Sequence, residues 1–117
     1  MNLRAPLVAV LLMMAAAPLA AQDRAEAKKH VEFGIQVAQK GLWREAIFRW
    51  ERATKIDPTY AAAYNNLAIA YEHEGELDKA RASYEKALEL DPDNALIKQN
   101  YELFKEINDR TSRQDGQ

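Results

Sequence analysis

The chain contains no cysteine among its 117 residues. It therefore cannot form a disulfide, cannot offer a thiolate to a metal or a substrate, and has no cysteine for a lipid anchor behind its N-terminal apolar segment. Glycine and proline are also scarce, with four of each, whereas 48% of the residues are hydrophobic and 29% are charged. This composition is typical of a globular protein, and the length leaves room for one small domain.

Histidine is scarce as well, and no catalytic motif is visible. Neither His30 nor His73 has a second histidine or a cysteine at metal-ligand spacing. We find no glycine-rich phosphate loop, nucleophile elbow or Ser-His-Asp set. The sequence therefore predicts a protein that is not an enzyme and has no catalytic residue, bound metal or cofactor.

A cluster of carboxylates around residues 72 to 78 keeps one alternative open. It lacks the glycine and the ligand alternation of a calcium loop, which favours a solvated acidic turn. Binding of a small ligand or a divalent metal near His73 remains the second alternative function. The carboxylates of this cluster are Glu72, Glu74, Glu76 and Asp78.

The net charge is small but unevenly distributed. Sixteen basic residues face eighteen acidic ones, giving a net charge of −2, so we expect no nucleic-acid partner and no general attraction to anionic lipid. Residues 27–60 hold seven basic and four acidic residues, a net charge of +3, whereas residues 61–94 hold three and eight, a net charge of −5. This asymmetry is compatible with oriented binding of a partner, with head-to-tail contact between copies in a homo-oligomer, or equally with solubility and no specific role.

Residues 1–21 follow the order of a secretory signal peptide. Arg4 precedes an apolar run, and small residues follow Pro18, which predicts cleavage after Ala21. An uncleaved anchor is the alternative, but residues 5–21 are fewer than the roughly 20 that span a bilayer, and they include Pro6 and Pro18. We expect an exported, periplasmic protein that meets the membrane only through this transient segment, with secretion or N-terminal anchoring as alternatives.

The rest of the chain contains an internal repeat. Residues 61–94, shifted back by 34 positions, lie on residues 27–60 with eight identities. Such a period, with two amphipathic helical patterns separated by a glycine, is typical of a helical repeat. The identical positions in the first copy are Ala27, Ile35, Gly41, Ala46, Glu51, Ala53, Asp57 and Pro58.

The pattern predicts an all-α protein with five helices, over residues 23–40, 43–56, 61–73, 77–90 and 95–108. A capping box of Asp23 and Glu26 is expected to begin the first helix, and Gly41 to end it. Asp57 and Pro58 are expected to end the second helix. Residues 109–117 contain no apolar side chain and are predicted to be disordered.

The second copy resembles the tetratricopeptide repeat, in which large and small residues alternate through a helix-turn-helix. This resemblance implies a short right-handed α-solenoid over residues 22–108, with repeats 27–60 and 61–94 and a capping helix 95–108. The first copy matches more loosely, with His30 and Val37 where aromatic residues are usual. The residues that carry the resemblance are Tyr64, Leu67, Ala68, Tyr71, Gly75, Ala80, Tyr84, Ala87 and Pro92.

The resemblance also implies a function. In such arrays the first helix of each repeat lines a concave groove, so we expect a non-catalytic interaction module or scaffold that binds a peptide or partner helix. The first alternative is self-association, in which another copy fills the groove. Of the residues that grip C-terminal carboxylates in some family members, only Asn66 is matched. The expected groove residues are Lys28, Val31, Ile35, Gln39, Asn65, Ile69, Glu72, His73 and Leu103.

Overall fold

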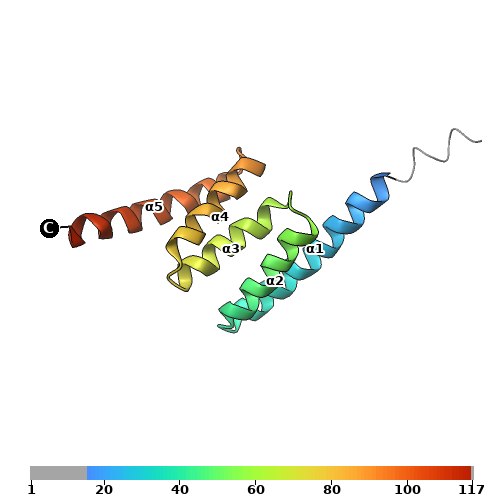
Figure 1. Ribbon diagram of the computed structural model, residues 1–117, viewed down its shortest axis with the longest axis horizontal. Helices are drawn as coiled ribbons and strands as arrows, with labels where there is room; N and C mark the ends of the chain where they lie inside the picture. Colours follow the sequence, from blue (N-terminus) through green and yellow to red (C-terminus); the bar gives the residue numbers. More distant parts are fainter. Residues whose placement is uncertain (1–15, 117) are drawn as a thin grey trace, which may run out of the picture.

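The structure, a computed structural model, describes residues 16–116 and confirms the all-α prediction. Its five helices run in the order α1, α2, α3, α4 and α5, and no strand occurs within these residues (Figure 1). None of the helices in residues 16–116 combines the length and apolar character needed to cross a bilayer. The helices are α1 Ala16–Gln39, α2 Trp43–Ile56, α3 Ala61–His73, α4 Leu77–Leu90 and α5 Ala95–Asp115.

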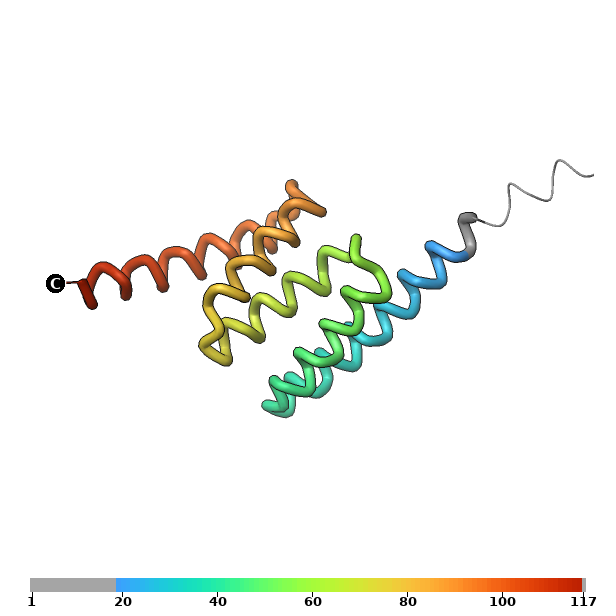
Figure 2. The backbone as a smooth tube through the Cα atoms, in the orientation of Figure 1, coloured from blue at the N-terminus to red at the C-terminus, as the bar shows by residue number. Residues whose placement is uncertain are grey.

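Two antiparallel helix pairs form the body of the molecule. α1 packs on α2 and α3 packs on α4, while α2 and α3 join the pairs and α5 covers α4 (Figure 1). Figure 2 shows that the first turns of α1 and the last turns of α5 project beyond this body at opposite ends. The expected stack of two repeats and a final helix is therefore the observed architecture.

Both tight turns within the helix pairs depend on glycine. Gly41 and Gly75 have φ angles of 79° and 76°, in the left-handed region that side chains disfavour. The N–H of Leu42 then donates to the carbonyl of Val37, and the N–H of Glu76 donates to the carbonyl of Tyr71. These bonds close the two helix ends as Schellman motifs, as the sequence predicted for Gly41.

Small side chains set the distance between the helices. The seven alanines that face neighbouring helices in α2, α3 and α4 are fully buried, so the helices approach closely and large residues fill the remaining space. Gly34 is the extreme case, because an added Cβ would lie 2.3 Å from Nε1 of Trp50. The buried alanines are Ala46, Ala53, Ala63, Ala68, Ala70, Ala80 and Ala87.

Hydrogen bonds to one buried carboxylate connect α1 to the turn between the two helix pairs. The carboxylate of Asp57 accepts hydrogen bonds from the backbone N–H and the hydroxyl of Thr59 and from Nε of Arg24. Burial alone would raise the pKa of Asp57, but the hydrogen bonds from Thr59 and Arg24 outweigh it and hold the pKa below its ordinary value. The carboxylate is therefore ionised at neutral pH, and Arg24 also lies over the ring of Tyr60.

Two helix boundaries differ from the sequence prediction. Within the described residues α1 already runs from Ala16, upstream of Asp23, so the expected capping box lies inside the helix. Residues 16–21 contain four alanines, the strongest helix former, and Pro18 stands near the helix start, where a missing N–H costs little. The rest of the predicted signal peptide, residues 1–15, lies outside the described residues.

The prediction of a disordered tail is wrong for residues 109–115, because α5 continues through Asp115. Without apolar residues, this part of the helix is supported by side-chain pairs one turn apart. Arg110 pairs with Glu106 at 2.6 Å, and the hydroxyl of Thr111 donates to the carbonyl of Ile107. Arg81 of α4 also reaches Asp109 at 3.6 Å. Such pairs extend a helix that packing has already nucleated.

Candidate partner-binding groove

The candidate groove lies on the first helix of each repeat. Three apolar residues recur there at intervals of 34 positions, namely Ile35 on α1, Ile69 on α3 and Leu103 on α5. Their exposed fractions are 40%, 36% and 50%, although each belongs to a packed helix. Exposed apolar side chains repeated on one side of a stack indicate a contact surface rather than a core.

Ile35 and Ile69 line a shallow depression of about 290 Å³. Side chains from three helices meet there, and most of the lining is apolar or aromatic, with two amides at the edge. The volume lies at the low end for ligand pockets, and suits one or two protruding side chains of a partner. The depression is lined by Ile35, Ala38, Gln39, Trp43, Trp50, Asn66 and Ile69.

Two predicted groove residues are buried, which corrects their assignment as partner contacts. Val31 is 5% exposed, and its carbonyl accepts a hydrogen bond of 3.0 Å from Nε1 of Trp50. Asn65 is also buried, and its Oδ1 accepts a bond from Nδ2 of Asn100 on α5. Both residues occupy the same position of the repeat, which faces the junction of neighbouring helices. Their side chains therefore pack between helices, in the wall of the groove, and are not available to a partner.

The other predicted residues divide between surface and wall. Lys28, Gln39 and His73 are exposed, and the His73 ring stacks on Trp43 with 4.2 Å between ring centroids. Glu72 is half-buried and accepts a hydrogen bond from the hydroxyl of Tyr84. Leu103 is exposed but lies outside the depression.

The groove residues expected from the sequence included neither Trp43 nor Trp50. Both line the depression. The signal was the position of Trp43 directly after the Gly41 turn, where the first turn of the second helix returns beside the first helix. Because these are the two tryptophans of the chain, indole fluorescence reports directly on this site.

Buried hydroxyls near the groove form structural hydrogen bonds. Burial and a hydrogen bond to Glu51 raise the pKa of Tyr71 well above its ordinary value, and burial with the charge of Glu72 does the same for the pKa of Tyr84. Both phenols remain protonated donors at neutral pH. They bind neighbouring helices together and are not poised for proton transfer.

The carboxylates of the acidic turn are largely engaged within the chain. Glu72 holds Tyr84, Glu74 lies 3.6 Å from Arg44, and Glu76 lies 3.8 Å from Lys79. Within residues 16–116, no group of three or more acidic or histidine side chains is placed to hold a metal ion. The turn is therefore built as a set of surface ion pairs.

Two family descriptions match the sequence. The one described as "Tetratricopeptide repeat" matches residues 61–94, and the one described as "TPR repeat" matches residues 37–75. The first match coincides with the second helix pair, α3 and α4, and the following turn. The second match joins the end of α1, α2 and α3, so it includes every lining residue of the depression except Ile35.

Curated relatives share this region over part of their length. Photosystem I assembly protein Ycf3 of Synechococcus sp. (strain WH7803) is 30% identical over 94 residues, which are 78% of this chain and 54% of that protein. Type IV pilus assembly protein PilF of Pseudomonas aeruginosa is 33% identical over 75 residues, 64% of this chain and 30% of that protein.

Some relatives carry the names of enzymes. Protein O-mannosyl-transferase TMTC4 of Mus musculus is 38% identical over 64 residues, 55% of this chain but only 9% of that protein. The chain thus spans from about a tenth to about half the length of these three relatives. The likeness to the transferase is confined to a small segment of it.

Proposed function

The chain belongs to the tetratricopeptide repeat family, and we propose that it is a non-catalytic scaffold that binds a peptide or partner helix in its concave groove. Two relatives named for the assembly of larger complexes support a role of this kind. The observation that carries the proposal is the apolar depression between α1 and α3. It leaves Ile35 and Ile69 substantially exposed where a soluble domain gains nothing by exposing them.

The composition of the groove indicates the chemistry of its partner. Isoleucine and tryptophan surfaces favour aliphatic or aromatic side chains, and the amides of Gln39 and Asn66 offer hydrogen bonds to a peptide backbone. Because the polar residues that bind C-terminal carboxylates elsewhere are largely missing, the partner is expected to bind through internal apolar residues. A leucine or phenylalanine side chain fits the depression.

We place this activity in the bacterial cell envelope, on the strength of the N-terminal sequence. Residues 1–21 have the order of a signal peptide, and the absence of cysteine makes the domain insensitive to an oxidising compartment. Mass spectrometry of the protein from a periplasmic fraction tests this. A chain that begins at Gln22 supports export, whereas a chain that retains Met1 and sediments with membranes contradicts cleavage.

The groove itself is tested by replacing Ile35 and Ile69 with glutamate. Both side chains are exposed, so the free energy of unfolding should change by less than about 0.5 kcal/mol for each. Two charges in the apolar depression should nevertheless weaken a partner at least about tenfold, because each carboxylate loses its hydration on binding. The measurement is photocrosslinking in the native envelope from a photoreactive residue at Gln39, with and without the two substitutions.

A photoreactive residue at Ala82, which is exposed on α4, is the matched control. Capture from Gln39 that disappears in the double variant, without capture from Ala82, supports the groove. Equal capture from both positions counts against it. Sedimentation decides the alternative of self-association: if the double variant dissociates an oligomer and leaves heterologous capture unchanged, another copy fills the groove.

A further inference from the structure

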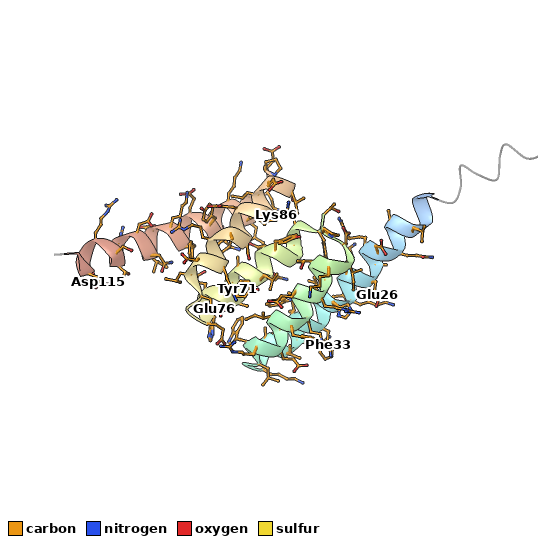
Figure 3. All side chains as sticks on the ribbon, viewed as in Figure 1. Glu26, Phe33, Tyr71, Glu76, Lys86 and Asp115 are labelled. Carbon is orange, nitrogen blue, oxygen red and sulfur yellow. The ribbon has the colours of Figure 1, made fainter. Side chains whose placement is uncertain are left out.

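A second exposed surface lies on the side of α1 and α2 that faces away from α3. Its centre consists of Phe33, Phe48 and Arg49, which we call the end face; Figure 3 shows Phe33 at this edge of the molecule. The two rings are 41% and 62% exposed. The guanidinium carbon of Arg49 lies 4.3 Å from the ring centroid of Phe33 and 5.9 Å from that of Phe48.

Arg49 has few partners on the end face. Its nearest carboxylate is that of Glu45, one turn earlier on α2 and 3.9 Å away. Within the described residues, the Nε atom of Arg49 is buried and has no hydrogen-bond partner. Because Nε is covered, an incoming carboxylate would bind the terminal nitrogens of the guanidinium, of which Nη2 lies 3.9 Å from Glu45, while apolar groups cover the rings.

The internal repeat shows what normally covers this face. The residues 34 and 68 positions after Phe33 are Leu67 on α3 and Tyr101 on α5, and these two helices pack on the second helix of the preceding repeat, α2 and α4 respectively. Leu67 is buried, and Tyr101 stacks on Tyr84 of α4 with 5.5 Å between ring centroids. On α1 the same position has no preceding helix within the described residues and stays exposed.

The flanking positions distinguish α1 from its counterparts. One helical turn on either side of Phe33 stand Lys29 and Gln36, both exposed. The corresponding residues on α3 and α5 are all apolar and buried. The end face therefore combines a small aromatic centre with a polar rim, the composition of a reversible contact rather than of a missing core. The buried counterparts are Ala63, Ala70, Ile97 and Phe104.

Charge indicates the kind of helix that fits. Residues 27–60 carry a net charge of +3, and basic side chains outnumber acidic ones along the exposed stripes of α1 and α2 that flank the end face. The contact between α4 and α5 shows how such a helix docks. The ring of Tyr84 on α4 stacks on the ring of Tyr101 on α5, and the carboxylate of the adjacent Glu85 accepts a 2.9 Å hydrogen bond from the hydroxyl of Tyr101. The basic residues on the two stripes are Lys29, Lys40, Arg49, Arg52 and Lys55, and the acidic ones are Glu26 and Glu45.

We propose that the end face docks an acidic amphipathic helix of a partner protein, which places an aromatic or aliphatic side chain on Phe33 and a carboxylate on Arg49. This surface is separate from the concave groove. The helix would stack on α1 as α4 stacks on α5, in the position of a preceding second helix. Complementary charge would orient the partner and fix the register of the two helices.

The probe is a synthetic peptide of residues 77–94, which contains α4 and has a net charge of −2 from three basic and five acidic residues. The control is the peptide of residues 43–60, which contains α2 and has a net charge of +1 from four basic and three acidic residues. Fluorescence anisotropy of each labelled peptide is measured against the full chain. We expect the acidic peptide to bind at least about tenfold more tightly, in the micromolar range that suits a short helix.

Substitutions on the end face and in the peptide test whether the peptide binds at this surface. Arg49→Glu should weaken binding of the acidic peptide at least about tenfold, and a peptide carrying Glu85→Arg should regain affinity for that variant but not for the original chain. Phe48→Ser, at the more exposed ring, provides an independent variant that leaves the core intact. Ile35→Glu with Ile69→Glu should not change binding, which separates this proposal from that of the groove.

Several outcomes overturn the proposal. Equal affinity for the two peptides, no binding at millimolar concentration, or binding that Arg49→Glu and Phe48→Ser leave unchanged would each remove it. If instead the full chain sediments as a dimer that these variants dissociate, the occupant is a second copy. If vesicles of phosphatidylglycerol bind the chain and these variants abolish it, the end face is a lipid contact and not a helix-docking surface.

Discussion

Replacing Gly34 with alanine is expected to lower the free energy of unfolding by about 2 to 6 kcal/mol, although it adds a single methyl group. The new Cβ would lie 2.3 Å from Nε1 and 2.7 Å from Cε2 of Trp50, a ring that is nearly fully buried. Relief of this overlap requires movement of the indole, which costs about 1 to 3 kcal/mol as overpacking. It also breaks the bond from Nε1 to the carbonyl of Val31, for about 1 to 3 kcal/mol more.

The second repeat supplies the matched control. Thirty-four positions later, Ala68 and Tyr84 occupy the places of Gly34 and Trp50, and both are buried. Transfer of that pair into the first repeat, as Gly34→Ala with Trp50→Tyr, should recover most of the lost stability, because the smaller ring leaves room for the methyl group. Urea denaturation followed by circular dichroism measures all three variants. Additive losses in the double variant would show that Gly34 and Trp50 are not coupled.

These pairs show why the packing was predictable from the sequence. A small residue on one helix and a large one on the next must recur together, because the distance between the helices is fixed by the repeat. The pattern therefore identified Ala68 and Ala80 from the sequence, and both are buried, as is Gly34 at the position equivalent to Ala68. The left-handed conformation of Gly41 follows in the same way from its position between two amphipathic patterns.

Helix ends beyond the packed body were not predictable in this way. The start of α1 and the end of α5 have few tertiary contacts, so they depend on alanine propensity and on pairs such as Arg110 with Glu106. These are weak, additive effects without a sharp sequence boundary. Hydrophobic periodicity correctly marks where packing stops. A helix that packing has nucleated continues past that point for as long as the helix propensity and side-chain pairs of the following residues support it.

The sequence placed the candidate groove on helices that do expose apolar residues, but two of the residues it named there are buried. Exposure at the position of Ile35 and Ile69 agrees with the prediction, whereas Val31 and Asn65 lie under neighbouring helices. The difference depends on a rotation of roughly 40° around the helix, since four residues advance by slightly more than one turn. Sequence periodicity locates a face of a helix, but the angle between neighbouring helices decides which edge of that face is covered.

Replacing Phe104 with alanine is expected to cost about 3 to 5 kcal/mol and to release α5 from the body. Phe104 is 1% exposed, and with Ile97 it makes up the buried apolar contact of this helix. Its ring packs against Tyr84 at 5.5 Å between centroids, beneath the guanidinium of Arg81 at 5.3 Å. Loss of the ring leaves a cavity at the place where the final helix is anchored. Leu103→Ala, at the neighbouring exposed position, is the control and should cost less than about 0.5 kcal/mol.

Hydrogen exchange separates local release from global unfolding. In a stack of repeats each unit depends on its neighbours, so the Phe104→Ala variant should lose amide protection in α5 first and in α4 next, while α1 and α2 keep theirs. A uniform loss of protection would show that the molecule is a single cooperative unit.

The same variant also tests the extent of the groove. Release of α5 removes Leu103 but leaves the depression between Ile35 and Ile69 intact. A partner that binds only in that depression keeps its affinity, and a partner that spans all three helices loses it.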